Sequence, residues 1–144
     1  MRLQQNLVIA DSSGAGRQPY HRIASSLEVP SGAYVVLGRN SNTAENGGVS
    51  LDYAYGNSLQ LANSVDAVKI SRVWGVDNSD TLTVNRTQYA QSVSWQNGIS
   101  RELKNPALDN RNMDGSNWAT ALASALYGTG TRGTPKAQNS TYTP

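Results

Sequence analysis

The chain contains no cysteine, which excludes disulfides, thiolate metal sites and cysteine nucleophiles together. It also contains no phenylalanine, so its interior must be built from Val, Leu, Ile and Ala with seven Tyr and three Trp residues. Charged residues make up only 15% of the chain, and its surface must therefore be covered largely by Asn, Ser, Thr, Gln and Gly. Such a polar but weakly charged surface is more typical of an extracytoplasmic protein than of a cytosolic enzyme.

Long apolar runs are also missing. No stretch approaches the ~20 apolar residues that a membrane helix needs. The apolar run at residues 7–10 is too short for the hydrophobic segment of a secretory signal. We therefore expect no signal peptide in this sequence, no transmembrane segment, and membrane contact only through partners. The polar, weakly charged composition nevertheless favours an extracytoplasmic location, periplasmic or at the cell surface.

Charge of one sign is not concentrated anywhere. Twelve basic residues oppose ten acidic ones, for a net charge of +2, and the arginines are spread along the chain. A protein that follows a phosphate backbone needs clustered basic residues. Direct binding of nucleic acid is therefore not expected.

Length and pattern predict one all-β domain. A single core in a chain of 144 residues can bury about two-thirds of the unfolded surface. Short runs rich in Val, Ile, Tyr and Leu alternate with clusters of Gly, Asn, Ser and Pro, the pattern of strands and tight connections. We expect an immunoglobulin-like antiparallel β-sandwich over residues 1–139, followed by a C-terminal tail over residues 140–144.

About eight short strands are expected. Within residues 20–29, the side chains of Ile23, Leu27 and Val29 should face inward, and the nearly apolar residues 34–37 resemble a central strand covered on both faces. An Ala-rich stretch at residues 117–126 is the one helical candidate, so we expect at most one short helix near the C-terminus, of one or two turns. The expected strands lie within residues 7–10, 20–29, 34–37, 49–55, 67–74, 81–95 (two strands with a bend near residues 85–86) and 99–103.

Four ordered segments carry a family resemblance. They are Gly-Ala-Tyr-Val-Val-Leu-Gly-Arg from Gly32, Tyr-Gly-Asn-Ser-Leu-Gln-Leu-Ala-Asn from Tyr55, Gly-Ser-Asn-Trp ending at Trp118, and Gly-Thr-Gly-Thr-Arg-Gly-Thr-Pro followed by Gln138-Asn139. Together they resemble the bacterial lamin-tail domain family. The resemblance implies an immunoglobulin-like sandwich used for binding and scaffolding, with no catalytic signature.

The resemblance covers residues 3–139 but departs from the family at its start. Family members usually open with an acidic-aromatic strand of the Glu-Trp-Ile-Glu-Leu type, and this chain begins where that strand should have ended. One interpretation is an incomplete sandwich whose unpaired edge is completed by a partner's strand. The other is that residues 3–10 pair in the vacant place and nothing is missing.

Residues for catalysis are in short supply. His21 is the only histidine, so a Ser-His-Asp site would have to use it. A lone histidine beside Arg22 at the start of a strand is more often a surface or packing residue. No pair of carboxylates has a spacing that demands a shared cleft. We therefore expect a protein that is not an enzyme.

Residues 110–115 partly copy a calcium-binding loop. Asn110, Asn112, Asp114 and Gly115 match part of its alternating oxygen ligands and its glycine. Ala121 stands where the bidentate glutamate should be, which removes the strongest ligand. A solvated loop with side-chain-to-backbone turns is the expected structure, and we predict no metal and no cofactor.

The aromatic residues divide between core and surface. Because the chain lacks phenylalanine, Trp95 and Trp118 are expected in the core, while Trp74 fits either place. Tyrosine can be half-buried with a wet hydroxyl, which suits an interface. Candidate partner-binding residues are Leu7, Val8, Ile9, Tyr53, Tyr55, Trp74 and Tyr142.

These observations favour a non-catalytic structural or protein-interaction module. It would be an accessory subunit that docks onto a larger membrane-associated or extracytoplasmic complex through a sheet edge and extended termini. One alternative is a carbohydrate- or cell-surface-binding module, which an exposed row of Tyr and Trp would favour. A more remote one is a DNA-associated module of a nuclease system, which clustering of Arg22, Arg39, Arg72 and Arg101 would favour.

Overall fold

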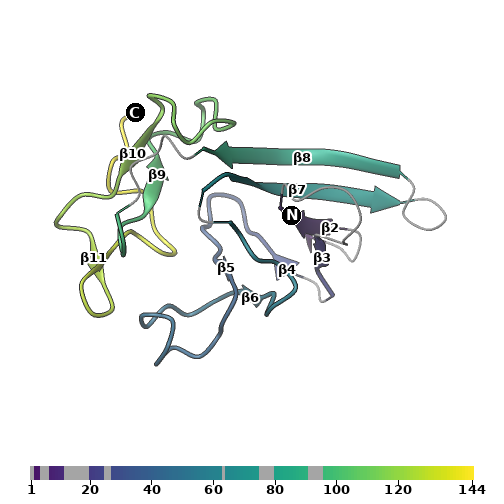
Figure 1. Ribbon diagram of the computed structural model, residues 1–144, viewed down its shortest axis with the longest axis horizontal. Coiled ribbons are helices and arrows are strands. Elements are labelled where there is room, and N and C mark those ends of the chain that lie inside the picture. The colour runs from purple at the N-terminus through teal and green to yellow at the C-terminus, as the bar shows by residue number, and fades with distance from the viewer. Residues whose placement is uncertain are drawn as a thin grey trace.

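The computed structural model describes residues 2–3, 7–11, 20–24, 27–62, 64–74, 80–90 and 96–144, and the side chains of residues 2, 3, 74, 80 and 81 lie outside that description. Within these ranges the chain forms twelve strands and no helix (Figure 1). The strands make one sheet of four strands and four sheets of two. The predicted all-β class is confirmed, whereas the packing of these small sheets as one sandwich stays a prediction.

The four-stranded sheet is antiparallel, in the order β3-β2-β7-β8. Its strands are β2 (Leu7–Ala10), β3 (Tyr20–Arg22), β7 (Asp66–Trp74) and β8 (Asp80–Tyr89). Strands β7 and β8 are the longest in the protein, and in Figure 1 they extend side by side as an arm. The strand expected at residues 67–74 is thus confirmed as β7.

Strand β8 is continuous where two strands with a bend were expected. The register between β7 and β8 shifts once, because Ile70 pairs with Asn85 while Ser71 pairs with Thr83. Val84 is therefore left without a partner in β7, as in a β-bulge. The bulge lies next to the predicted bend at residues 85–86. One extra residue changes the register there without ending the strand.

Strand β2 lies in the middle of the sheet. Val8 pairs with Arg22 of β3 on one side and with Ser71 of β7 on the other. The side chains of Leu7, Val8 and Ile9 are buried. Residues 7–10 thus fill an internal position in the sheet.

The hydrophobic core lies against one face of this sheet. Ile23 is only 1% exposed and packs with Leu7, Ile9, Leu27 and Leu59. Burying a side chain of this size stabilises the fold by about 1.5–3 kcal/mol. The predicted inward positions are confirmed at residues 23 and 27, and residue 29 is partly buried against the same cluster. The short strands β1 (Arg2–Leu3) and β4 (Leu27–Glu28) pair beside it.

The prediction of a central strand at residues 34–37 is wrong. Only β5 (Leu37–Gly38) forms, in a two-residue parallel pair with β6 (Tyr53–Ala54), and Tyr34 is 46% exposed. The backbone N–H of Val36 donates to the Asp52 carboxylate at 2.7 Å and not to a neighbouring strand. The strand expected at residues 49–55 shrinks to β6 because polar side chains compete for its backbone groups.

The Ala-rich segment at residues 117–126, the one helical candidate, is not a helix. It contains β10 (Trp118–Thr120), which pairs with β9 (Arg101–Leu103), and it ends at the first residue of β11 (Leu126–Tyr127). Ala121 continues the pairing by donating its N–H to the Ser100 carbonyl at 2.9 Å. Helix propensity is a weak preference, and tertiary pairing overrides it here. Strand β12 (Thr131–Arg132) pairs with β11.

The C-terminal residues lie along β9. Asn139 Nδ2 donates to the Leu103 carbonyl at 2.8 Å, and the backbone N–H of Thr143 donates to the Lys104 carbonyl at 3.0 Å. The segment expected as a tail at residues 140–144 is therefore hydrogen-bonded to its own domain. Figure 1 shows the C-terminus beside β9 and β10.

Candidate functional site

Strand β8 forms one edge of the four-stranded sheet, and only part of that edge is covered. Near its C-terminal end, Gln88 donates its N–H to the Arg111 carbonyl at 3.0 Å and accepts from the Met113 N–H at 2.8 Å. The hydroxyl of Thr87 donates to the Asn110 carbonyl at 3.0 Å. Residues 110–113 therefore cover the C-terminal part of the strand.

The N-terminal half of β8, residues 80–84, has no second strand beside it in the part of the chain that the structure describes. We call this half the open edge. Its two large apolar side chains, Leu82 and Val84, are 57% and 56% exposed. An edge strand presents unpaired backbone donors and acceptors to which another chain can bind as an added strand. The arrangement is therefore suited to docking an extended protein segment.

Three cations lie on the two strands that form this edge. Lys69 of β7 stands directly opposite Arg86 of β8, and Arg72 of β7 stands opposite Leu82. None of the three forms an ion pair with another residue that the structure describes. Like charges directly opposite each other on adjacent strands are destabilising. The Lys69 and Arg86 pair is therefore a local cost to the stability of the sheet.

The candidate residues in β2 do not offer a free edge. Leu7, Val8 and Ile9 are each at most 6% exposed, and their strand is paired on both sides. A partner cannot reach these side chains or add a strand to this segment without displacing β3 or β7. The two edges of this sheet are β3 and β8, which lie on either side of β2 and β7.

The candidate aromatic residues lie in different places. Tyr53 and Tyr55 are half-buried against the core cluster, and burial raises the pKa of the Tyr55 hydroxyl. Tyr142 is 38% exposed in the C-terminal segment. Trp74 ends β7, and its side chain lies outside the described residues, as does all of Trp95. Four of the predicted residues meet at the core cluster, namely Leu7, Ile9, Tyr53 and Tyr55, whereas Tyr142 lies in the C-terminal segment.

The lone histidine joins β3 to the segment after β6. His21 Nε2 lies 2.7 Å from the Tyr53 hydroxyl, and His21 Nδ1 lies 2.6 Å from Ser58 Oγ. Ser58 Oγ in turn donates to the Tyr55 carbonyl. A neutral imidazole protonated on Nδ1 satisfies all these contacts, with Tyr53 donating to Nε2. Both ring nitrogens are therefore engaged in holding the sheet against residues 53–58.

The calcium-like loop forms turns of its own. Asn112 Oδ1 accepts from the Asp114 N–H at 3.0 Å, and Asp109 Oδ1 accepts from the Arg111 N–H at 3.0 Å. These are the side-chain-to-backbone turns that the sequence predicted. Over the ranges that the structure describes, no group of three His, Asp or Glu side chains is placed to hold a metal ion.

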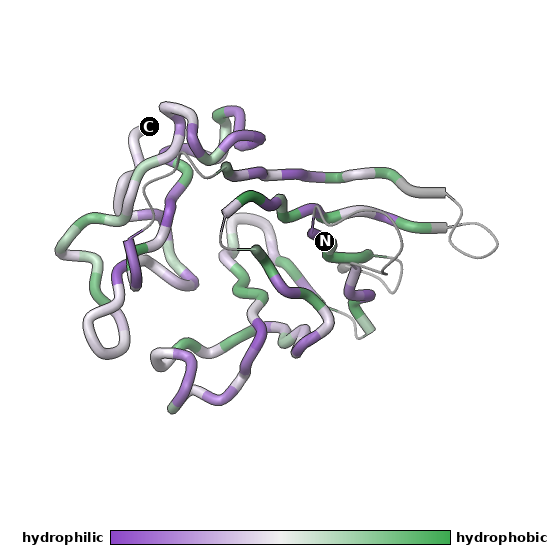
Figure 2. Tube along the Cα trace, in the orientation of Figure 1, coloured by the Kyte–Doolittle hydropathy of each residue, from purple (hydrophilic) through white to green (hydrophobic). Residues whose placement is uncertain are grey.

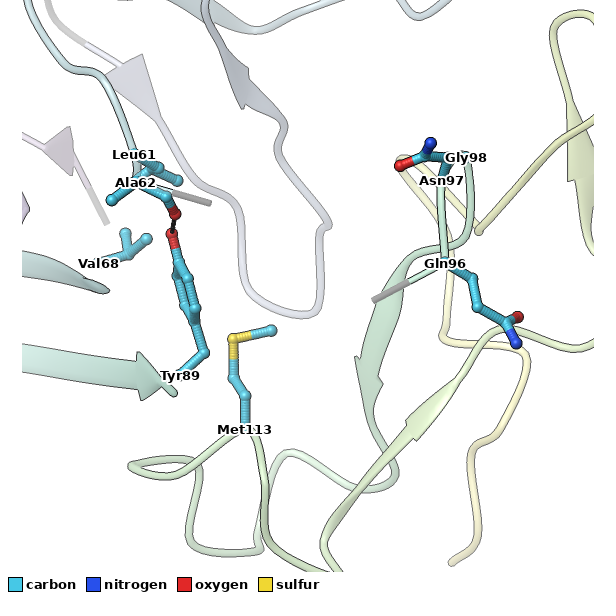
Figure 3. A pocket seen from close by; sticks show the side chains of 8 residues that line it. All are labelled: Leu61, Ala62, Val68, Tyr89, Gln96, Asn97, Gly98 and Met113. Carbon is cyan, nitrogen blue, oxygen red and sulfur yellow. Dashed lines mark hydrogen bonds between the residues drawn. The ribbon is translucent and has the colours of Figure 1, made fainter. Parts of the chain in front are cut away.

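A cavity of about 620 Å³ lies where β8 meets the C-terminal half of the chain. In Figure 3, Tyr89 donates a hydrogen bond to the Ala62 carbonyl on one side, and Met113 lies beside its ring. Burial raises the pKa of the Tyr89 hydroxyl. The wall is mostly apolar, with amide groups from residues 96–97 on the far side. The cavity thus adjoins the covered end of β8, away from the open edge.

The four arginines that would indicate DNA binding are dispersed. Val8 pairs with both Arg22 and Ser71, so these two share one face of the sheet and Arg72, the next residue, lies on the other. The remaining two are held locally: Arg39 donates to the Asn57 side chain and Arg101 to the Met113 carbonyl.

Comparison with protein-family models, with curated proteins and with solved structures finds no match for this chain. In the described ranges, no helix has the length and hydrophobicity to cross a membrane.

The sequence did not identify the residues of the open edge as a site. The alternation of residues 81–84 correctly predicted a strand. It did not show that the side chains of Leu82 and Val84 would both be exposed. Cation placement depends on the register between β7 and β8, which the sequence does not reveal. The signal that the sequence offered for this site was the alternation of Leu82 and Val84 with Thr81 and Thr83.

Proposed function

We propose that this chain is a non-catalytic protein-interaction module, an accessory subunit that docks onto a larger membrane-associated or extracytoplasmic complex. Docking occurs by addition of a partner strand to the open edge of β8. The observation that carries the proposal is that no strand among the described residues pairs with the outer side of residues 80–84, where the side chains of Leu82 and Val84 are exposed.

Edge strands are normally protected because they promote aggregation. Here the covered half of β8 is protected by residues 110–113, whereas the other half presents two apolar side chains to solvent. Main-chain hydrogen bonds to an added strand would supply affinity, and these side chains would supply specificity. The expectation of docking through a sheet edge is kept in this proposal, with the site moved from residues 7–9 to β8.

The same proposal includes membership of the lamin-tail domain family, with the small sheets arranged as an immunoglobulin-like sandwich. Its support is the ordered set of sequence segments together with the all-β structure. An extracytoplasmic location, periplasmic or at the cell surface, is part of the proposal and is supported by the polar, weakly charged composition.

Two placements weigh against the other candidate functions. The arginines that would track DNA are split between opposite faces of the sheet or held by local hydrogen bonds. Tyr53 and Tyr55 pack against the core and do not form an exposed flat row for sugar stacking. Protein docking through β8 is therefore the function that the described residues support best.

Photo-cross-linking in the producing cells tests the proposal. A photoreactive amino acid at Thr83 places the cross-linker on the open edge, and one at Leu122 gives a control at an exposed position in the other half of the chain. Each adduct is purified and its protein content identified by mass spectrometry. Leu82→Lys should disrupt the edge, and Leu122→Lys is the matched control, because the two leucines are 57% and 50% exposed.

We expect one defined adduct from position 83, obtained with a fixed stoichiometry, that is lost in Leu82→Lys and retained in Leu122→Lys. Docking at the open edge would be contradicted if the same adduct formed equally from positions 83 and 122. It would also be contradicted if the adduct persisted unchanged in Leu82→Lys. Circular dichroism of both variants checks that they remain folded.

A further inference from the structure

We infer that the segment added at the open edge is acidic, with carboxylates on both of its faces. This inference rests on the proposed function, because it names the chemistry of the partner that binds there. It is carried by the placement of Lys69, Arg72 and Arg86 around the edge. Like charges that lie together, with no ion pair to another residue in the described ranges, suit the approach of an oppositely charged partner.

Two of the cations share one face of the sheet. Lys69 and Arg86 are direct cross-strand partners, and Ser71 with Thr83 forms the next row on that face. Arg86 is exposed and Lys69 is half-buried. An added strand beside Thr83 would bring its side chains on this face diagonally next to Arg86. Long acidic side chains reach across such diagonals.

The third cation lies on the opposite face. Arg72 pairs with the exposed Leu82, one row from Thr83, and successive residues of a strand point to opposite faces. A carboxylate on the added strand can reach Arg72 across Leu82, whose own side chain needs an apolar neighbour. The partner segment would therefore combine an apolar residue opposite Leu82 with acidic residues on both faces.

Cations on both faces favour a strand over a flat polyanion. A nucleic acid that lies on one face of the sheet would contact Lys69 and Arg86 or Arg72, but not all three. A strand in the plane of the sheet projects side chains to both faces, so its side chains can reach all three cations. Figure 2 shows hydrophobic and hydrophilic positions mixed in the open-edge half of β8 and a hydrophilic run in its covered half, so the mixed half suits a partner of mixed acidic and apolar composition.

The test uses the full chain and two synthetic octapeptides. The acidic peptide has Glu at its first, fourth, fifth and eighth positions and Val or Thr elsewhere, so that carboxylates project to both faces. The basic peptide has Lys at those positions. Binding is measured by isothermal titration calorimetry at low ionic strength, where exposed charges are least screened. A DNA duplex is titrated in parallel.

Charge reversal on the protein supplies the matched control. The double variant Lys69→Glu with Arg86→Glu removes the cations on one face. Arg39→Glu with Lys104→Glu changes the net charge by the same amount elsewhere in the chain. We expect the acidic peptide to bind about tenfold more tightly than the basic one, from cross-strand charge pairs. The first double variant should reverse this preference and the second should leave it in place.

Equal binding of the two peptides, or a preference that both double variants change alike, would overturn the inference. So would tighter binding of the DNA duplex than of the acidic peptide, or binding of neither peptide at about 1 mM. The Leu82-dependent adduct from position 83 would survive such a result if docking is correct and the charge inference is wrong. Loss of that adduct as well would overturn the proposed function.

Discussion

The Glu102 carboxylate accepts a hydrogen bond from Ser140 Oγ at 2.7 Å, although the two residues are 38 positions apart. Glu102 is only 3% exposed, and the N–H and hydroxyl of Thr141 donate to the same oxygen at 3.1 and 3.2 Å. Thr134 donates to the other oxygen. The C-terminal segment is thus part of the fold and is held by a buried carboxylate.

Glu102→Ala should destabilise the protein by about 3 kcal/mol, because it removes a buried acceptor and leaves several donors unsatisfied. Urea unfolding followed by circular dichroism measures the change. Glu45→Ala is the control: Glu45 is exposed and contacts only the Asn40 side chain, so its loss should cost less than about 0.5 kcal/mol. Equal effects of the two substitutions would show that the Glu102 contacts do not hold the C-terminal segment.

Gly128→Ala should destabilise the protein by about 3 kcal/mol, because Gly128 has φ of 56° and a Cβ there would clash with the backbone carbonyl of Gly47. Gly130 also has a positive φ, of 98°, but a Cβ there meets only open space. Gly130→Ala should therefore cost about 1 kcal/mol, from backbone strain alone. Thermal unfolding of both variants measures the difference, and similar melting temperatures would contradict the close approach.

The Asp52 carboxylate and Lys136 Nζ are 2.8 Å apart, and this contact and the hydrogen bond from the Val36 N–H lower the pKa of Asp52. A carboxylate whose pKa is lowered by folding contributes stability above its unfolded pKa of about 4, and the contribution disappears as the pH falls through the folded pKa. Asp52→Asn should therefore be less stable than the native chain near neutral pH, and the gap should close at acidic pH. Urea unfolding across the pH range measures it, and a gap independent of pH would contradict the ion pair.

Arg111 holds the pKa of Asp109 at about 2, through its guanidinium and its backbone N–H. In Arg111→Gln the pKa of Asp109 should rise toward the ordinary value of about 4. Carbon-detected NMR of the side-chain carboxyl measures this titration, with Arg39→Gln as the control. Because both partners are exposed, high salt should also weaken the shift. An Asp109 pKa that changes neither in Arg111→Gln nor at high salt would contradict the ion pair between Asp109 and Arg111.

The parts of the fold that sequence predicted well depend on local alternation and burial. Residues 67–74 alternate clearly and form β7, and the inward positions at Ile23 and Leu27 follow from the same pattern. The predictions at residues 34–37 and 117–126 failed for a different reason. There, polar contacts from Asp52 and pairing with β9 determine the backbone, and both come from residues distant in the sequence.

The candidate site shows the same division. The expectation of docking through a sheet edge came from the missing opening strand, but it pointed to Leu7, Val8 and Ile9, which lie inside the sheet. Which strand forms the edge depends on topology, and the opposition of Lys69 and Arg86 depends on register after a bulge. Neither the edge strand nor the register can be predicted from a single sequence when the pairing of its strands is unknown.

Hydrogen exchange at β8 tests the central claim most directly. The amides of residues 80–84 are compared by mass spectrometry in the free protein and in the complex purified through the position 83 adduct, with the amides of β7 as an internal reference. We expect the amides of residues 80–84 that point away from β7 to exchange quickly in the free protein and at least about tenfold more slowly in the complex, because added-strand hydrogen bonds protect them. Unchanged exchange at residues 80–84, with new protection elsewhere in the chain, would contradict strand addition at β8.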